Sequence, residues 1–310
     1  MIELKMMSKD RQKALTRRRF LGGLVSAGCQ AAVGCRSLNG ESLSFAMIND
    51  FHENVSFFDR LAPWIIGCDF TVVAGDILND VRADGSVQTL LVDPMDALHR
   101  RTGVPCEFVR GNHETRGPAA GKLHEALGFK DGVYYRAKTV KGARCLFLDT
   151  AENRPSQQMS AERYAMFERY LTDERRWLER EVASADWRTA RARFVFLHIP
   201  PAIVNPDADT RARAPIQRSV RREAPVTGLY EVLRTANVTA MFSGHVHIGA
   251  FDEPSDEHPY PVIVGGGHSD PVRCRLTEAL LTRCDVSSAS FRVRQYALDG
   301  TIRRERTFAL

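Results

Sequence analysis

Five short polar clusters in this chain carry residue types that bind metal ions, and each cluster directly follows an apolar run. The clusters are Asn49-Asp50-Phe51-His52, Gly75-Asp76-Ile77-Leu78-Asn79-Asp80, Gly111-Asn112-His113-Glu114, His198-Ile199-Pro200-Pro201 and Gly244-His245-Val246-His247. Carboxylate, amide and imidazole groups suit Fe, Mn and Zn. Two such ions held about 3.5–4 Å apart promote in-line attack on phosphorus. One cluster alone is common in loops, but five together predict a shared site for metal-dependent phosphoryl chemistry.

The strands that precede these clusters must position them. Short apolar strands between amphipathic helices indicate a sheet that is covered on both faces. In an open α/β sheet, ligand crevices form at the carboxyl ends of the strands, so we expect the clusters to meet at that edge. The expected strands are 43–48, 70–74, 106–109, 145–148, 194–197, 239–242 and 261–264, and the expected helices are 55–65, 93–100, 119–127, 161–183 and 228–235.

The C-terminal part of the chain has a different pattern. Residues 291–298 and 301–308 alternate polar and apolar side chains around Asp299-Gly300, which predicts a β-hairpin over about 290–309. The whole chain is 44% hydrophobic and 26% charged, which is typical of a globular protein. Residues 42–310 are expected to form a single domain with this hairpin at its end. The polar segment 205–227 is either a surface loop or a lid over a site.

The ordered set Asp-x-His, Gly-Asp, Gly-Asn-His-Glu, His and Gly-His-x-His resembles the calcineurin-like metallophosphoesterase superfamily over residues 44 to about 270. This resemblance implies an α/β fold, in which a two-layer sandwich of mixed β-sheets is flanked by helices. It also implies a dinuclear metal site at the carboxyl edge of the strands. The implied ligands are Asp50, His52 and His247 for the first ion, Asn112, His198 and His245 for the second, and Asp76 as the bridge between them.

The same resemblance implies a reaction. A hydroxide that bridges the two ions attacks the phosphorus of a phosphoester substrate, and His113 protonates the leaving oxygen as general acid. The alternative for His113 is a role as an outer hydrogen-bonding partner of a ligand. Two other functions stay open, a strict phosphodiesterase or nucleotide-directed hydrolase and a non-catalytic, metal-stabilised binding protein. The two ions could be Fe, Mn or Zn.

Finer features are similar to exported members of this superfamily, many of which depend on the twin-arginine (Tat) pathway. These features are residues 111–117, Tyr134-Tyr135 and Leu148-Asp149-Thr150-Ala151-Glu152. Arg116 is a candidate clamp for a phosphate oxygen, with a surface loop arginine as the alternative. Asn79 stands where the purple acid phosphatases place an iron-binding tyrosine, so a coloured tyrosinate site is not expected.

Residues 1–35 are expected to be an export signal. The run Thr-Arg-Arg-Arg-Phe-Leu at 16–21 resembles a Tat leader, and the uncharged stretch 21–34 follows it. An amphipathic helix is the alternative. Cys29 or Cys35 could carry a lipid anchor, and simple cleavage near 31–34 is the other outcome. The protein is therefore expected in the periplasm or on the outer face of a bacterial membrane, after passage through the Tat machinery.

The formal charge of +5 does not indicate a nucleic-acid partner. Residues 1–34 hold seven of the 43 basic and two of the 38 acidic residues, which leaves 36 of each sign in the rest of the chain. No basic stripe with interleaved aromatic residues is present, so a nucleic-acid scaffold is not expected. Cys274 and Cys284 could form a disulfide, and the sequence leaves this pairing open.

Overall fold

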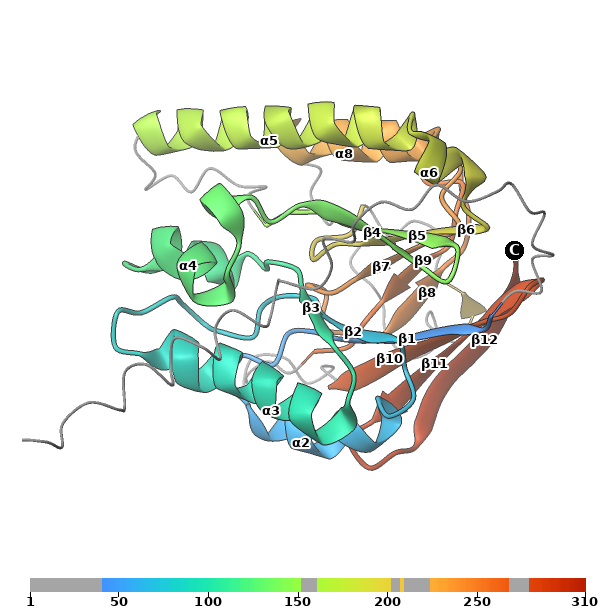
Figure 1. Cartoon of the computed structure of the whole chain (residues 1–310), viewed down its shortest axis with the longest axis horizontal. Helices are drawn as coiled ribbons and strands as arrows, with labels where there is room; N and C mark the ends of the chain where they lie inside the picture. Colours follow the sequence, from blue (N-terminus) through green and yellow to red (C-terminus); the bar gives the residue numbers. More distant parts are fainter. Residues whose placement is uncertain (1–40, 152–160, 202–206, 209–223, 268–278) are drawn as a thin grey trace, which may run out of the picture.

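Two six-stranded β-sheets pack face to face in this computed structural model, and helices cover both outer faces (Figure 1). The structure describes residues 41–151, 161–201, 207–208, 224–267 and 279–310. The expected sandwich of two mixed sheets flanked by helices is therefore confirmed. Within the described residues, no helix is long and apolar enough to cross a membrane.

The first sheet has the strand order β12-β11-β10-β1-β2-β3. Strands β1, β2 and β3 run parallel, and the C-terminal strands are antiparallel to their neighbours. The strands are β1 (Leu43–Ile48), β2 (Phe70–Val73), β3 (Cys106–Phe108), β10 (Leu280–Val286), β11 (Ser290–Ala297) and β12 (Ile302–Ala309). Strands β11 and β12 form a hairpin in which Ser290 pairs with Ala309 and Tyr296 with Ile302.

The second sheet has the strand order β4-β5-β6-β7-β9-β8. Its four central strands run parallel, and the edge strands β4 and β8 are antiparallel to their neighbours. The strands are β4 (Arg136–Val140), β5 (Ala143–Phe147), β6 (Ala192–Phe196), β7 (Ala240–Ser243), β8 (Ala250–Asp252) and β9 (Val262–Val264).

Helices lie on the outer face of each sheet. Figure 1 shows α2 and α3 beneath the first sheet, and α5, α6 and α8 above the second. The α-helices are α2 (Ser56–Leu61), α3 (Asp93–Thr102), α4 (Leu123–Leu127), α5 (Ala161–Val182), α6 (Ala185–Thr189) and α8 (Ala224–Arg234). The short 3₁₀ turns are η1 (Ala62–Trp64), η3 (His113–Thr115), η4 (Ala120–Lys122) and η5 (Lys130–Gly132), and η2 (Gln88–Val92) is a π-helical turn that continues into α3.

Aromatic side chains fill the space between the sheets. Because side chains alternate along a strand, Phe45 of β1 points into this space, while Ala46 and Ile48 pack on the helix side. The Phe45 ring contacts the rings of Phe70, Phe194, Phe196 and Phe242 with centroid distances of 5.0–5.3 Å. This rigid core fixes the relative position of the strand ends that carry the polar clusters.

The elements differ from the sequence expectation in a few places. The helix expected over 55–65 is α2 followed by the turn η1, because Pro63 lies in the first turn of η1. The helix expected over 119–127 begins with the 3₁₀ turn η4 before α4. Strands β4, β8 and β10 were not expected. Strand β4 is half-buried at a sheet edge and has no continuous apolar run, and β10 mixes buried and partly buried positions.

Candidate metal centre

The five polar clusters lie together at one edge of the sandwich. Strands β1, β2 and β3 are parallel to one another, and so are β6 and β7, and a polar cluster follows each of them. The backbone joins the clusters: Asp50 N–H donates to Gly75 O at 2.9 Å, His52 N–H to Asp76 O at 3.0 Å, and Gly244 N–H to His198 O at 2.9 Å. The two sheets thus contribute to a single site.

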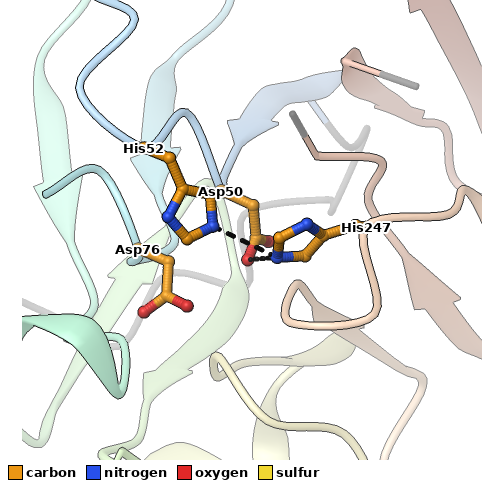
Figure 2. Close-up of side chains that lie close together, drawn as sticks. All are labelled: Asp50, His52, Asp76 and His247. Atoms are coloured by element: carbon orange, nitrogen blue, oxygen red, sulfur yellow. Dashed lines mark hydrogen bonds and ion pairs between the residues drawn. The ribbon is translucent and has the colours of Figure 1, made fainter. Parts of the chain in front are cut away.

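One group of donors surrounds Asp50 (Figure 2). Asp50, His52, Asp76 and His247 each offer a ligand atom, and these atoms lie within 4.8 Å of one another. His247 Nε2 is 3.1 Å from Asp50 Oδ1 and 3.2 Å from His52 Nε2. Three of these residues are the expected ligands of the first ion, and the fourth is the expected bridge.

A second group of donors shares Asp76 with the first. Ligand atoms of Asp76, His198 and His245 also lie within 4.8 Å of one another. His198 Nε2 is 3.2 Å from Asp76 Oδ2 and 3.2 Å from Asn112 Oδ1. The structure thus brings all seven expected ligands together, and the Asp76 carboxylate belongs to both groups.

The chemistry of these donors fits metal ions. Asp50 Oδ1 is buried and accepts no hydrogen bond of ordinary geometry from the described residues. The Nε2 atoms of His52 and His247 face each other at 3.2 Å. A cation between converging imidazole and carboxylate groups would satisfy all of these atoms.

The backbone at the site is strained. Five of the seven expected ligands have positive φ angles in the left-handed region, which costs on the order of 1–3 kcal/mol for a residue other than glycine. These residues are Asp50 (55°), His52 (46°), Asp76 (52°), His245 (70°) and His247 (62°). The surrounding hydrogen bonds hold this conformation, and His245 N–H donates to Asp50 Oδ2 at 2.8 Å. Strain of this kind is typical of functional sites.

The buried carboxylate of Glu114 holds the loops after β2 and β3 together. Its two oxygens accept the N–H groups of Asp76 (2.7 Å), Ile77 (2.8 Å), Leu78 (3.0 Å) and Gly111 (2.9 Å). Burial and the charge of Asp76 raise the pKa of Glu114 to about 7, against the lowering effect of these bonds. This role of Glu114 was not predicted from the sequence, although Glu114 directly follows His113 in its motif.

Hydrogen bonds at Nδ1 orient three of the histidines. His198 Nδ1 is 2.7 Å from Ala74 O, which leaves Nε2 to face the donors. Asn79 serves the other two: its Oδ1 is 3.1 Å from His52 Nδ1, and its backbone O is 2.7 Å from His113 Nδ1. Asn79 thus orients two histidines, one through its side chain and one through its backbone oxygen.

His113 and Arg116 lie at the open side of the site. His113 Nε2 is 3.9 Å from Asp76 Oδ2, and its side chain is 24% exposed. Its backbone N–H donates to Asp76 Oδ1 at 2.8 Å. The guanidinium of Arg116 is exposed and lies 3.2 Å from His113 Nε2. Both residues are thus next to the donor groups rather than among them.

The electrostatics of the site favour positive charge at its centre. Burial opposes ionisation of His198, but the carboxylates of Asp76 and Asp50 outweigh it and raise the pKa of the imidazole to about 10. Burial and the charge of His198 lower the pKa of His245 to about 4. Without metal ions, the buried carboxylates therefore hold a proton on one imidazole. Metal ions would displace that proton, as metal binding at such ligands generally does.

Several sequence expectations lie outside the described residues. They concern the leader 1–35 with Cys29 and Cys35, most of the loop 205–227, and Cys274 with its proposed disulfide. The possible partner, Cys284, is buried in the core between the sheets. Burial raises the pKa of the Cys106 and Cys145 thiols to about 12, which fits their role as small packing residues.

Solved structures with a similar fold include two phosphatases and PhoD. A dimetal phosphatase from Danio rerio is 13% identical, with a TM-score of 0.58, and the match covers 86% of this chain and 98% of that one. PhoD is 12% identical, with a TM-score of 0.56, and the match covers 87% of this chain and 69% of that one. The purple acid phosphatase PPD1 from yellow lupin (Lupinus luteus) is 11% identical, with a TM-score of 0.53. That match covers 87% of this chain and 54% of that one.

The sequence comparison identifies the family directly. No curated protein matches the chain. The family model of the calcineurin-like phosphoesterases matches residues 43–249, which contain every cluster of the site. Because this match spans more than half of the 310 residues and the fold agrees with it, the chain belongs to the calcineurin-like phosphoesterase family and is a hydrolase of phosphoric ester bonds.

Proposed function

We propose that this protein is a dinuclear metal-dependent phosphoester hydrolase whose ions are held by the seven clustered donors. Asp50, His52 and His247 would hold the first ion; Asn112, His198 and His245 would hold the second. The observation that carries this proposal is the Asp76 carboxylate, which belongs to both donor groups. When bound, the ions would acidify water and neutralise charge on the phosphoryl oxygens.

His113 is the proposed general acid. The bond between its Nδ1 and Asn79 O leaves Nε2 directed toward the open side of the site, where a leaving oxygen would lie. The N–H bond to Asp76 fixes His113 relative to the bridging carboxylate. A partly exposed imidazole in this position can give a proton to the leaving group and regain it from water.

Arg116 is the proposed phosphate clamp, and it favours phosphomonoesters as substrates. Its guanidinium lies against His113 Nε2, and the described residues place no carboxylate in an ion pair with it. A cation held beside an imidazole is stabilised when an anion binds between them. A monoester carries an additional negative charge to meet this cation, whereas a diester does not.

The full-length protein loaded with Mn²⁺, Zn²⁺ or Fe²⁺ tests this function. We expect hydrolysis of p-nitrophenyl phosphate to exceed that of bis(p-nitrophenyl) phosphate in kcat/KM. The variant Asp76→Asn should lose both bound ions and nearly all activity. The exposed Asp59, which pairs with Arg101, gives the control Asp59→Asn with unchanged activity. A preference for the diester would favour the strict phosphodiesterase, and bound ions without hydrolysis of either ester would favour a non-catalytic binding protein.

We further propose that residues 1–35 direct the protein through the Tat pathway to the periplasm or the outer face of the membrane. The support is the sequence pattern of the leader. Replacing Arg17 and Arg18 by lysine should leave the protein in the cytoplasmic fraction of a bacterial host. Separate Cys29→Ser and Cys35→Ser variants, labelled with a radioactive fatty acid, would show which cysteine carries a lipid. Export of the double-lysine variant would contradict the proposal.

A further inference from the structure

The carboxyl end of β5 supplies no metal donor, yet it lies beside the strands that do. Strand β5 pairs with β6, which leads to His198, and its end carries Asp149 and Thr150. Both side chains are fully buried. The buried polar contacts of these two residues lead directly to the two loops that carry Asn112 and His198.

Asp149 connects this strand end to the loop of Asn112. Its Oδ2 accepts hydrogen bonds from Arg110 Nε and from the Tyr170 hydroxyl, both at 3.0 Å, and forms an ion pair with Arg110 NH2 at 2.7 Å. Arg110 directly precedes Gly111 and Asn112, and its guanidinium lies 4.4 Å from the centre of the Tyr134 ring. A buried, charge-assisted contact of this kind helps to fix the backbone at Arg110.

Thr150 connects the same strand end to the loop of His198. Its Oγ1 accepts the N–H of Ile199 at 2.8 Å, and Ile199 directly follows His198. On the other side, the Tyr230 hydroxyl of α8 donates to Ile199 O at 2.6 Å. Without the threonine oxygen, the buried N–H of Ile199 would have no acceptor, so the loop would have to move to find one.

We propose that Asp149 and Thr150 are positioning residues for the second metal ion, because they hold Asn112 and His198 at the 3.2 Å separation seen between their ligand atoms. This inference rests on the proposed function, since it assumes that these two residues share an ion. The contacts of the first ion's donors run instead through Asn79 and through the loops after β1, β2 and β7. The effect should therefore fall on one ion and not on both.

Calorimetric titration of the metal-free, full-length protein with Zn²⁺ tests the inference without any activity measurement. We expect two binding steps for the wild type. In Thr150→Val, which keeps the volume but loses the acceptor, one of the two steps should lose about 10–100-fold in affinity, while the other stays within about twofold. Thr150→Ser keeps an acceptor and should bind both ions nearly as the wild type does.

Thr71→Val is the matched control. Thr71 is equally buried, and its Oγ1 has no hydrogen-bond partner in the part of the chain that the structure describes, so this variant should bind both ions as the wild type does. If Thr150→Val does not fold, Tyr230→Phe removes the other bond to Ile199 and should weaken the same step by a smaller factor. Asp149→Asn should weaken that step as well, because it removes the negative charge that Arg110 contacts at this position.

The outcomes separate the inference from the function on which it rests. Wild-type affinity at both steps in Thr150→Val, or an equal loss at both steps, would overturn the positioning role while leaving the dinuclear site intact. Failure of the wild type to bind two ions would instead remove the proposed function itself. Recovery in Thr150→Ser, with Thr71→Val unchanged, would establish that the hydroxyl oxygen at 150 sets the second site.

Discussion

Single buried side chains decide whether the donors of this site can converge. Glu114 accepts four backbone N–H groups, three from the loop after β2 and one from the loop after β3. No amide can replace it, because a glutamine presents an NH₂ group where one of the carboxylate oxygens accepts. The position of Asp76 thus depends on a residue that itself has no direct role in phosphoryl chemistry.

Glu114→Gln should therefore lower both metal affinity and stability. We expect the free energy of unfolding to fall by about 1–3 kcal/mol, since at least one buried N–H loses its acceptor. Urea unfolding of the metal-free protein measures this change, and elemental analysis measures the ion content. The exposed Glu125 of α4 provides the control Glu125→Gln, which should change stability by less than about 0.5 kcal/mol. Equal stability of the two variants would refute the role of Glu114.

His113→Asn should separate proton transfer from metal binding. General acid catalysis contributes about 10²–10⁴-fold, so kcat should fall by that factor while the ion content stays at the wild-type level. The loss should be smaller for substrates with good leaving groups, such as p-nitrophenyl phosphate, than for alkyl phosphates, which need the proton. An equal loss on both kinds of ester would indicate that His113 only supports a neighbouring ligand.

At the scale of elements, the loop after β9 packs closely against Asp50 and Asn49. A Cβ atom on Gly267 would lie 2.3 Å from Asp50 Cβ, and one on Gly265 would lie 2.0 Å from Asn49 Oδ1. Gly267→Ala should therefore displace Asp50 and lower the affinity for the first ion by about tenfold or more. In Gly121→Ala the new methyl group meets nothing within 4 Å, so metal binding should not change. Calorimetric titration with Zn²⁺ compares the two variants.

The edge strands β3 and β4 join the two sheets through Glu107. Its carboxylate contacts Arg136 NH2 at 2.7 Å and Lys138 Nζ at 2.9 Å. Burial opposes ionisation, but these two cations hold the pKa of Glu107 below its ordinary value. An acid with a lowered pKa in the folded state contributes stability above its unfolded pKa, and that contribution is lost as the pH falls through the folded pKa.

Glu107→Gln should consequently make the free energy of unfolding depend less on pH under acidic conditions. Between pH 7 and pH 3, the wild type should lose about 1 kcal/mol more than the variant, a modest figure because the Lys138 side chain is 43% exposed. Urea unfolding of the metal-free protein at both pH values measures the difference. The exposed pair Arg175–Glu179 supplies the control Glu179→Gln, whose profile should follow that of the wild type. Parallel profiles for Glu107→Gln and the wild type would contradict the assignment.

At the scale of the whole molecule, the metal ions should link the two sheets and stabilise their packing. The donors Asp50, His52, Asp76 and Asn112 follow strands of the first sheet, whereas His198, His245 and His247 follow strands of the second. Ions that bind only the folded chain stabilise it by about 2.7 kcal/mol at a concentration 100 times their Kd.

Removal of the ions with a chelator should then lower Tm by about 5–10 °C. Differential scanning calorimetry with and without the chelator measures this shift, and added Zn²⁺ or Mn²⁺ should reverse it. The Asp76→Asn protein should show little response to the chelator, because it lacks the carboxylate shared by both donor groups. An equal response in the wild type and in this variant would show that the ions act elsewhere.

The sequence by itself predicted the donors, their order and their common edge. Asp50, Asp76, Asn112, His198 and His245 each follow a short apolar strand, and the carboxyl ends of parallel strands must share an edge. The motif order pointed to the family, and the alternation of apolar strands and helices indicated the layers. Local pattern was sufficient here because it depends only on neighbouring residues in the chain.

Only the tertiary structure decided what holds the donors in place. The family resemblance implied Asp76 as the bridge, and the structure brings its side chain together with donors from loops far apart in the chain. The roles of Glu114, Asp149 and Thr150 depend on backbone or side-chain groups 36–49 residues away. Strands β4, β8 and β10 likewise depend on pairing with their neighbouring strands. Such contacts carry no local periodicity, so they exist only once the sheets have packed.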